Sequence, residues 1–132
     1  MELITIIDSI AKRSISKLSI ALLAVYYILV LYFTVINRPV GVYSAELDLL
    51  WSYRKWFAGN WELGREILYN MAMFVPIGFS LGVLLAKRKY RLIFAFVIGF
   101  LLSAIIEILQ LYFMRGLCEF DDLFSNTFGA IL

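Results

Sequence analysis

Three polar residues, Ser103, Glu107 and Gln110, lie inside an otherwise apolar run from about Leu92 to Phe113. Their i, i+4, i+7 spacing places all three on one side of a helix. An acidic side chain at the centre of a membrane helix costs at least roughly 2.5–3.5 kcal/mol, so Glu107 must face protein, water or a ligand rather than lipid. A carboxylate held in this way can exchange a proton or contribute oxygen ligands to a divalent cation.

Further polar residues occur at the ends of two other apolar segments. Asn70 follows Glu66 by one helical turn, and Asp122 and Asn126 have the same i, i+4 spacing. When the basic residues are placed inside the cell, these helix ends converge on one layer in the outer half of the membrane. The sequence therefore predicts a ligand-binding cluster made of Arg65, Asn70, Ser103, Glu107, Gln110, Arg115, Asp121, Asp122 and Asn126.

The composition limits the chemistry that this cluster can perform. The chain contains no histidine and one cysteine, which excludes imidazole zinc sites, histidine-activated nucleophiles and intrachain disulfides. Glu107 and Asp122 remain as candidates for a general acid/base pair. Glu107, Asp121 and Asp122 are candidate oxygen ligands for a magnesium or calcium ion. The sequence contains no recognised catalytic motif. We expect no cofactor.

The same residues also permit a purely structural interpretation. Arg65 or Arg115 would pair with Glu107 or an aspartate, the amides would satisfy helix ends, and the cluster would only hold the bundle together. The functional interpretation is a polar pocket at the depth of a lipid headgroup or a lipid-linked sugar, because ionisable residues inside membranes mark functional sites. The sequence alone leaves both interpretations open.

The composition places the chain among integral membrane proteins. Of its 132 residues, 63% are apolar and 17% are charged, and such values are rare in soluble domains. A helix that crosses a bilayer needs about 20 apolar residues. We therefore expect one all-α domain over residues 1–132, with spans at about 18–36, 67–86 and 92–113. The last apolar stretch, 123–132, is too short to cross and is predicted to be an incomplete fourth helix.

The positions of the basic residues predict the orientation of the chain. Lys12, Arg13 and Lys17 precede the first span, and residues 87–91 contain four basic residues in a short loop. Both segments should be cytoplasmic. The N-terminus is then inside the cell and the polar cluster outside, and since topology accounts for the basic loop, no nucleic-acid partner is expected.

The first outer loop, residues 37–66, is predicted to contain a short interfacial helix. Ser44 can cap it, and the acidic residues Glu46 and Asp48 would then lie in its first turn. Ala58 and Gly59 would end it. Its concentration of aromatic residues favours a position at the headgroup level, and these residues are Trp51, Tyr53, Trp56, Phe57 and Trp61.

Small residues on two spans predict close contacts between helices. Gly78 and Gly82 form a GxxxG step, and Ala95, Gly99 and Ser103 recur every four residues. Such faces permit packing within one chain and self-association equally well. Both a monomer and a homo-oligomer are consistent with this pattern.

Three blocks of sequence resemble the VanZ-like family of bacterial membrane proteins. They run from Arg65 to Gly78, from Ser103 to Gln110, and from Arg115 to Gly129, and they cover about the second half of the chain. The resemblance implies a single VanZ-like transmembrane domain in the bacterial cytoplasmic membrane. It also implies an association with resistance to glycopeptide antibiotics, especially lipidated ones such as teicoplanin.

Two functions of different class follow from the cluster and the resemblance. The first is a non-enzymatic envelope protein that contacts a lipid headgroup, a lipid-linked cell-wall precursor or a lipoglycopeptide, with Arg65 and Arg115 on an anionic group. The second is a membrane enzyme that acts on a lipid-linked or amphiphilic substrate through Glu107 and Asp122. A transporter ranks third because the sequence contains no inverted repeat.

Overall fold

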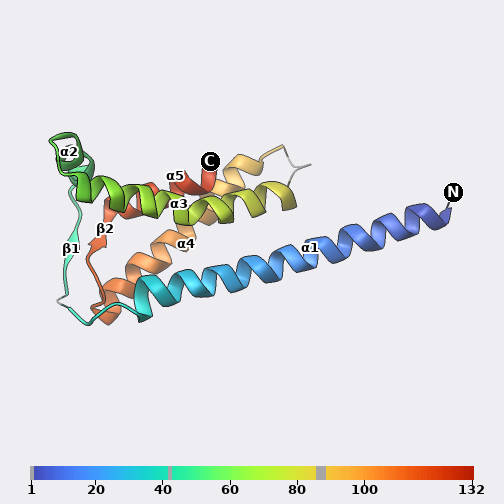
Figure 1. The fold of residues 1–132 in the computed structure, drawn as a ribbon, viewed down its shortest axis with the longest axis horizontal. Coiled ribbons are helices and arrows are strands. Elements are labelled where there is room, and N and C mark those ends of the chain that lie inside the picture. Colours follow the sequence, from blue (N-terminus) through green and yellow to red (C-terminus); the bar gives the residue numbers. More distant parts are fainter. Residues whose placement is uncertain (1, 42, 86–88) are drawn as a thin grey trace.

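A computed structural model describes residues 2–41, 43–85 and 89–132, except for the side chains of residues 2–16. The elements follow one another along the chain as shown in Figure 1: α1 (Glu2–Leu31), the π-helix η1 (Tyr32–Ile36), β1 (Ala45–Glu46), α2 (Trp51–Phe57), α3 (Trp61–Leu84), α4 (Arg91–Phe113), β2 (Cys118–Glu119) and α5 (Phe120–Ile131). The predicted all-α membrane bundle is confirmed.

Among the described residues, three segments are long and apolar enough to cross a membrane: Lys17–Ile36, Trp61–Leu84 and Arg91–Phe113. The second begins at Trp61 rather than near residue 67 because Asn60 caps it. The Asn60 side chain accepts hydrogen bonds from the backbone N–H groups of Glu62 and Leu63, and an asparagine at this position stabilises a helix start.

The basic residues that predict the orientation lie only partly within the described structure. Lys87 and Arg88 lie outside the described residues, as do the side chains of Lys12 and Arg13. The remaining members of the two basic groups are exposed: Lys17 lies within α1, Lys89 precedes α4, and Arg91 is the first residue of α4. The orientation therefore stays a prediction from the sequence.

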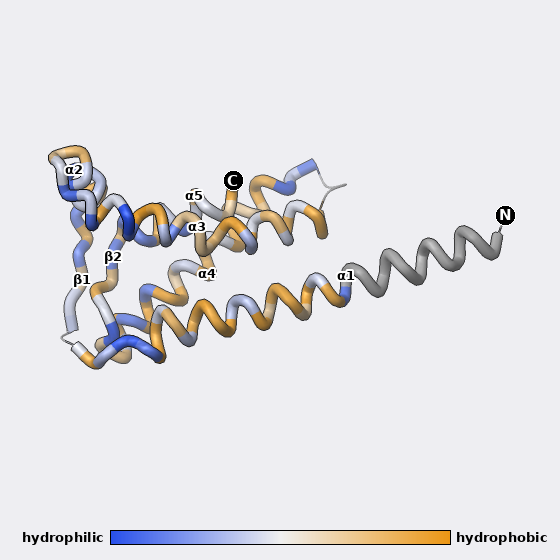
Figure 2. The backbone as a smooth tube through the Cα atoms, in the orientation of Figure 1, coloured by the Kyte–Doolittle hydropathy of each residue, from blue (hydrophilic) through white to orange (hydrophobic). Residues whose placement is uncertain are grey.

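The helices form a bundle with one polar end. Figure 1 shows α3 and α5 running in the same direction, with α4 crossing them and α1 extending far beyond the others. Apolar residues predominate along the described parts of α1, α3 and α4, whereas hydrophilic residues gather at the end that carries α2, β1 and β2 (Figure 2). The polar residues of interest lie toward this end.

The core is formed by apolar side chains from α1, η1, α3, α4 and α5 and includes Val30, Val35, Phe74, Ile77 and Ile106. Two tyrosines of α1 attach this helix to its neighbours. The Tyr26 hydroxyl donates to the Met73 carbonyl at 2.8 Å, and the Tyr27 hydroxyl donates to the Leu102 carbonyl at 2.7 Å. These bonds satisfy polar groups that lipid cannot satisfy.

The short helix α5 packs closely against α3 and α4. A Cβ atom at Gly78 would overlap the Ala130 carbonyl, and one at Gly99 would meet the Ala130 side chain. Gly78 and Gly99 thus act as contact points, as predicted, whereas a Cβ at Gly82 would find nothing within 4 Å. The 12 residues of α5 extend about 18 Å, which is too short to cross a bilayer.

The prediction for the start of the interfacial helix was wrong. Ser44 does not cap it; the segment after Ser44 is extended, and β1 pairs in parallel with β2, so that Ala45 lies opposite Cys118. The Cys118 N–H donates to the Ser44 carbonyl at 3.2 Å. This long-range backbone pairing competes with local helix formation, and α2 starts only at Trp51. Its end is as predicted, with Gly59 at a φ of 106°.

Candidate functional site

Three carboxylates gather where α4, β2 and α5 meet, and we call Glu107, Glu119 and Asp122 the acidic cluster. A Glu107 carboxylate oxygen accepts a 2.9 Å hydrogen bond from the backbone N–H of Glu119. Asp122 accepts a hydrogen bond from the side chain of Asn70 on α3. Glu107 is only 5% exposed, so the cluster runs from the interior of the bundle to its polar end.

Arg38 is the cation that faces the acidic cluster. Its charge acts on all three carboxylates, and its guanidinium lies against Gly116, where a Cβ atom would be 2.7 Å from Nη1. Arg115 fixes the backbone at Arg38, because Arg115 Nη1 donates to the Ile36 and Arg38 carbonyls at 2.7 and 2.5 Å. Arg38 was not among the predicted site residues, because its only signal in the sequence is its charge after the first span.

The two arginines singled out from the sequence have other positions. Arg115 is occupied by backbone carbonyls, and Arg65 is exposed on α3 with its Nη2 atom 4.0 Å from a Glu62 oxygen. Within the described parts of the chain, neither forms an ion pair with Glu107 or with an aspartate. The pairing that the structural interpretation assigned to Arg65 or Arg115 is therefore not formed, and Arg38 takes the position beside the carboxylates.

The environment raises the pKa values of the two cluster members that lie outside the spans. Burial raises the pKa of Glu119 to about 7, and the negative charges of Asp122 and Glu66 add to this rise. Burial also raises the pKa of Asp122 to about 6, against the opposing effects of Arg38 and of the Asn70 hydrogen bond. Both groups can therefore exchange protons near neutral pH.

We expect the free energy of unfolding to fall as the pH rises from about 4 to about 7. Folded Glu119 and Asp122 keep their protons to higher pH than the unfolded chain does, so stability is lost as the pH passes through the folded pKa values. Asp122 accounts for at most about 3 kcal/mol of this loss. Thermal unfolding in detergent at several pH values measures it, with Glu62→Gln as the exposed control. An unchanged pH profile in Asp122→Asn would contradict the assignment.

Two buried amides border the acidic cluster. Asn126 Nδ2 donates to the Ser103 hydroxyl at 2.9 Å, and Gln110 Nε2 donates to the Thr34 carbonyl at 3.0 Å. The remaining atoms, Asn126 Oδ1 and Gln110 Oε1, are buried without a hydrogen-bond partner among the described residues. The prediction that Ser103, Glu107 and Gln110 share one inward face is confirmed, since all three are buried on α4.

Asp121 has a structural role that separates it from its neighbour Asp122. One carboxylate oxygen accepts from the Leu50 N–H at 2.6 Å, and the other accepts from the Ser52 N–H and hydroxyl at 2.9 and 2.6 Å. Both oxygens thus fix the start of α2. Among the described residues, no three Asp, Glu or Cys side chains could hold a metal ion, so the proposed Glu107, Asp121 and Asp122 centre is not formed.

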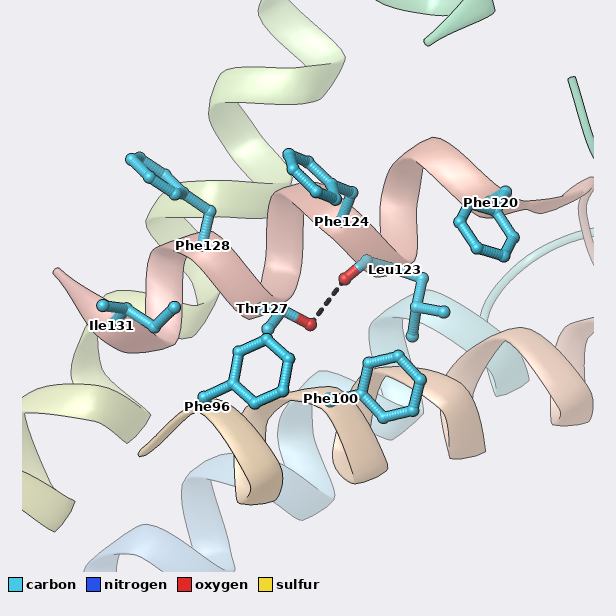
Figure 3. A pocket seen from close by; sticks show the side chains of 8 residues that line it. All are labelled: Phe96, Phe100, Phe120, Leu123, Phe124, Thr127, Phe128 and Ile131. Atoms are coloured by element: carbon cyan, nitrogen blue, oxygen red, sulfur yellow. Dashed lines mark hydrogen bonds between the residues drawn. The ribbon is translucent and has the colours of Figure 1, made fainter. Parts of the chain in front are cut away.

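An apolar groove lies on another face of α5. It has a volume of about 220 Å³ and lies between α4 and α5, lined by Phe96, Phe100, Phe120, Leu123, Phe124, Thr127, Phe128 and Ile131. Figure 3 shows the Thr127 hydroxyl turned to the Leu123 carbonyl, to which it donates at 2.7 Å. The groove therefore presents almost only apolar surface. By helical periodicity, Asp122 and Asn126 point away from it.

The site combines three carboxylates, one guanidinium and two half-satisfied amides. It can bind a hydrogen-bond donor or a cation, and Glu107 and Asp122 lie close enough for their charges to interact. The nine predicted site residues therefore divide into two groups. Asn70, Ser103, Glu107, Gln110, Asp122 and Asn126 lie in or beside the acidic cluster, whereas Arg65, Arg115 and Asp121 face elsewhere.

Comparison with known proteins shows which family the chain resembles. A family model described as VanZ/LLP1 matches residues 21–132. Protein VanZ of Enterococcus faecium is 35% identical to the chain over 68 residues, which make up 52% of the chain and 41% of VanZ. The match thus spans less than half of the length of VanZ. No solved structure matches the chain significantly.

Proposed function

The chain belongs to the VanZ/LLP1 family, and from this relationship we propose that it lowers the effect of lipoglycopeptide antibiotics through the acidic cluster and Arg38. It is a multi-pass membrane protein with three helices able to span the bilayer. Its proposed location is the bacterial cytoplasmic membrane. Its proposed contact is an envelope amphiphile: a lipid headgroup, a lipid-linked cell-wall precursor or the lipoglycopeptide itself.

The observation that supports this proposal is that the acidic cluster destabilises the folded chain. A structural clamp would be expected to pair each buried charge with a partner in the protein. Here one guanidinium, that of Arg38, acts on three carboxylates, and the buried oxygen atoms of Gln110 and Asn126 have no partner in the described structure. Such an arrangement destabilises the folded chain unless something else binds there, and this favours a function over a purely structural role.

Susceptibility of a Gram-positive host that expresses this chain tests the proposal. We expect expression to raise the minimum inhibitory concentration of teicoplanin more than that of vancomycin, because the resemblance associates the family with lipidated drugs. Immunoblots of the membrane fraction verify that the chain is present. Unchanged values for both drugs at normal membrane levels would contradict the proposed function.

The proposed orientation places the acidic cluster outside the cell, and Cys118 can report it. Cys118 is the only cysteine in the chain and is half-buried in β2, next to Glu119. We expect a membrane-impermeant maleimide to label intact cells, slowly, because burial raises the pKa of the Cys118 thiol. Cys118→Ser is the control. Labelling that requires permeabilised cells would reverse the orientation.

A membrane enzyme is the second candidate, and one observation favours it. Glu107 and Asp122 belong to the same cluster, so a carboxylic acid and a carboxylate can coexist there as a general acid/base pair. Turnover of a lipid-linked substrate that is lost in Glu107→Gln would support this function. Absence of turnover for envelope lipids, with a folded protein, would favour the binding protein instead.

A further inference from the structure

The charges around the acidic cluster are unbalanced. The three carboxylates come from α4, β2 and α5, and the negative charge of Glu66 on α3 acts on two of them. Asp121 adds to the same negative field, and the positive charge of Arg38 opposes it. This field attracts a positively charged group and repels phosphate or carboxylate.

Two unpartnered oxygen atoms belong to amides that lie one helical turn from members of the cluster. Gln110 lies one turn from Glu107 on α4, and Asn126 lies one turn from Asp122 on α5, so each amide shares a helix face with a member of the cluster. These amides are 2% and 1% exposed, and Gln110 Oε1 and Asn126 Oδ1 have no donor in the described structure. Buried acceptors of this kind normally have a partner. The missing partner must be a hydrogen-bond donor.

The Gln110 amide and the Arg38 guanidinium meet at Gly116. A Cβ atom at Gly116 would be 2.7 Å from Arg38 Nη1 and 3.7 Å from Gln110 Cδ. Gly116, with a φ of 126°, thus leaves room for both side chains. Any side chain at this position would be strained and would push the guanidinium away.

We propose that the acidic cluster binds the protonated primary amine of an envelope amphiphile, with Glu107, Glu119 and Asp122 accepting its N–H groups. This inference rests on the proposed function and names the ligand class of the same site. A primary ammonium has three donors and one positive charge, which match the surplus of acceptors and of negative charge. A quaternary ammonium has the charge but no N–H group, and an anionic headgroup has neither.

Lipid binding to the purified full chain tests the inference. The protein in detergent is titrated with phosphatidylethanolamine, phosphatidylcholine and phosphatidylglycerol of identical acyl chains, and native mass spectrometry measures the bound fraction. Phosphatidylethanolamine is expected to bind about tenfold more tightly than phosphatidylcholine, because loss of the N–H donors leaves the acceptors unpaired. Equal binding of these two lipids, or tighter binding of phosphatidylglycerol, would show that a lipid is not the source of the amine.

A second series of titrations uses teicoplanin before and after acetylation of its free amine. Loss of binding on acetylation supports the inference with the drug, rather than a lipid, as the source of the amine. If neither the lipid series nor the drug series shows a preference for the free amine, the inference is wrong. The two series therefore test separately whether binding requires a free amine and which molecule supplies it.

Matched variants locate the binding to the acidic cluster. Glu119→Gln keeps the size of the side chain and should abolish the amine preference, whereas Glu62→Gln, on an exposed side chain of α3, should keep it. Thermal unfolding verifies that both variants are folded. If Glu119→Gln is unfolded, Asp122→Asn takes its place. An amine preference that survives in a folded cluster variant would overturn the inference.

The outcomes also separate this inference from the proposed function. Amine binding in a chain that leaves drug susceptibility unchanged would contradict only the proposed function. Protection against teicoplanin without any amine preference would contradict only the ligand class. Each claim therefore has a readout of its own.

Discussion

Replacing Gly129 by alanine is expected to destabilise the bundle by about 1–3 kcal/mol, and a larger side chain by more. A Cβ atom at Gly129 would overlap the backbone of Met71 on α3. A backbone group cannot rotate away as a flexible side chain can, so α5 and α3 must move apart. The midpoint of thermal unfolding in detergent measures the loss, and Gly78→Ala should behave similarly because its Cβ would overlap the Ala130 carbonyl.

Gly82→Ala is the matched control for this prediction. Gly82 is also in α3, and a Cβ atom there would meet nothing within 4 Å. Alanine has the higher helix propensity by about 1 kcal/mol, so the control should be neutral or slightly more stable. Equal losses for Gly129→Ala and Gly82→Ala would show that the α3–α5 contact does not determine the result.

Asp121→Ala is expected to release α2 from α5 and to cost about 3 kcal/mol or more. Asp121 is fully buried and accepts three hydrogen bonds from Leu50 and Ser52. These bonds hold Leu50 at a φ of 62°, a conformation that L-residues rarely adopt. Thermal unfolding gives the loss of stability, and limited proteolysis between β1 and α3 should show cleavage that the unmodified chain resists.

Asp48→Ala controls for the loss of a carboxylate near the same helix. Asp48 forms an ion pair with Arg54, but both side chains are exposed, and such pairs contribute at most about 1 kcal/mol. We therefore expect a small effect on stability and no new cleavage. If Asp121→Ala is no more sensitive than Asp48→Ala, Asp121 does not fix α2.

The fold was predictable where local physics determines it. Three spans follow from apolar length, and the inward face of α4 follows from the spacing of Ser103, Glu107 and Gln110. The start of α2 was not predictable, because Ser44 lies in a segment whose backbone pairs with residues more than 70 positions later. Local capping rules contain no information about such a distant partner.

The candidate site was predictable only in part. Asp121 and Asp122 are adjacent in sequence, yet a rotation of 100° per residue directs one to α2 and the other to Asn70. Arg38 was missed because the turn after η1 brings it to the cluster, and Arg115 fixes that turn through two backbone carbonyls. The sequence identified Arg115 as important, but the role was that of a positioning residue.

Teicoplanin susceptibility of cells that express Glu107→Gln tests the central claim most directly. Glutamine keeps an oxygen that can accept the Glu119 N–H, so the fold is retained while the titratable carboxyl group is lost. We predict that Glu107→Gln loses the protection at equal membrane levels, whereas Glu62→Gln protects like the unmodified chain. Full protection by Glu107→Gln would contradict the claim that the acidic cluster carries the function.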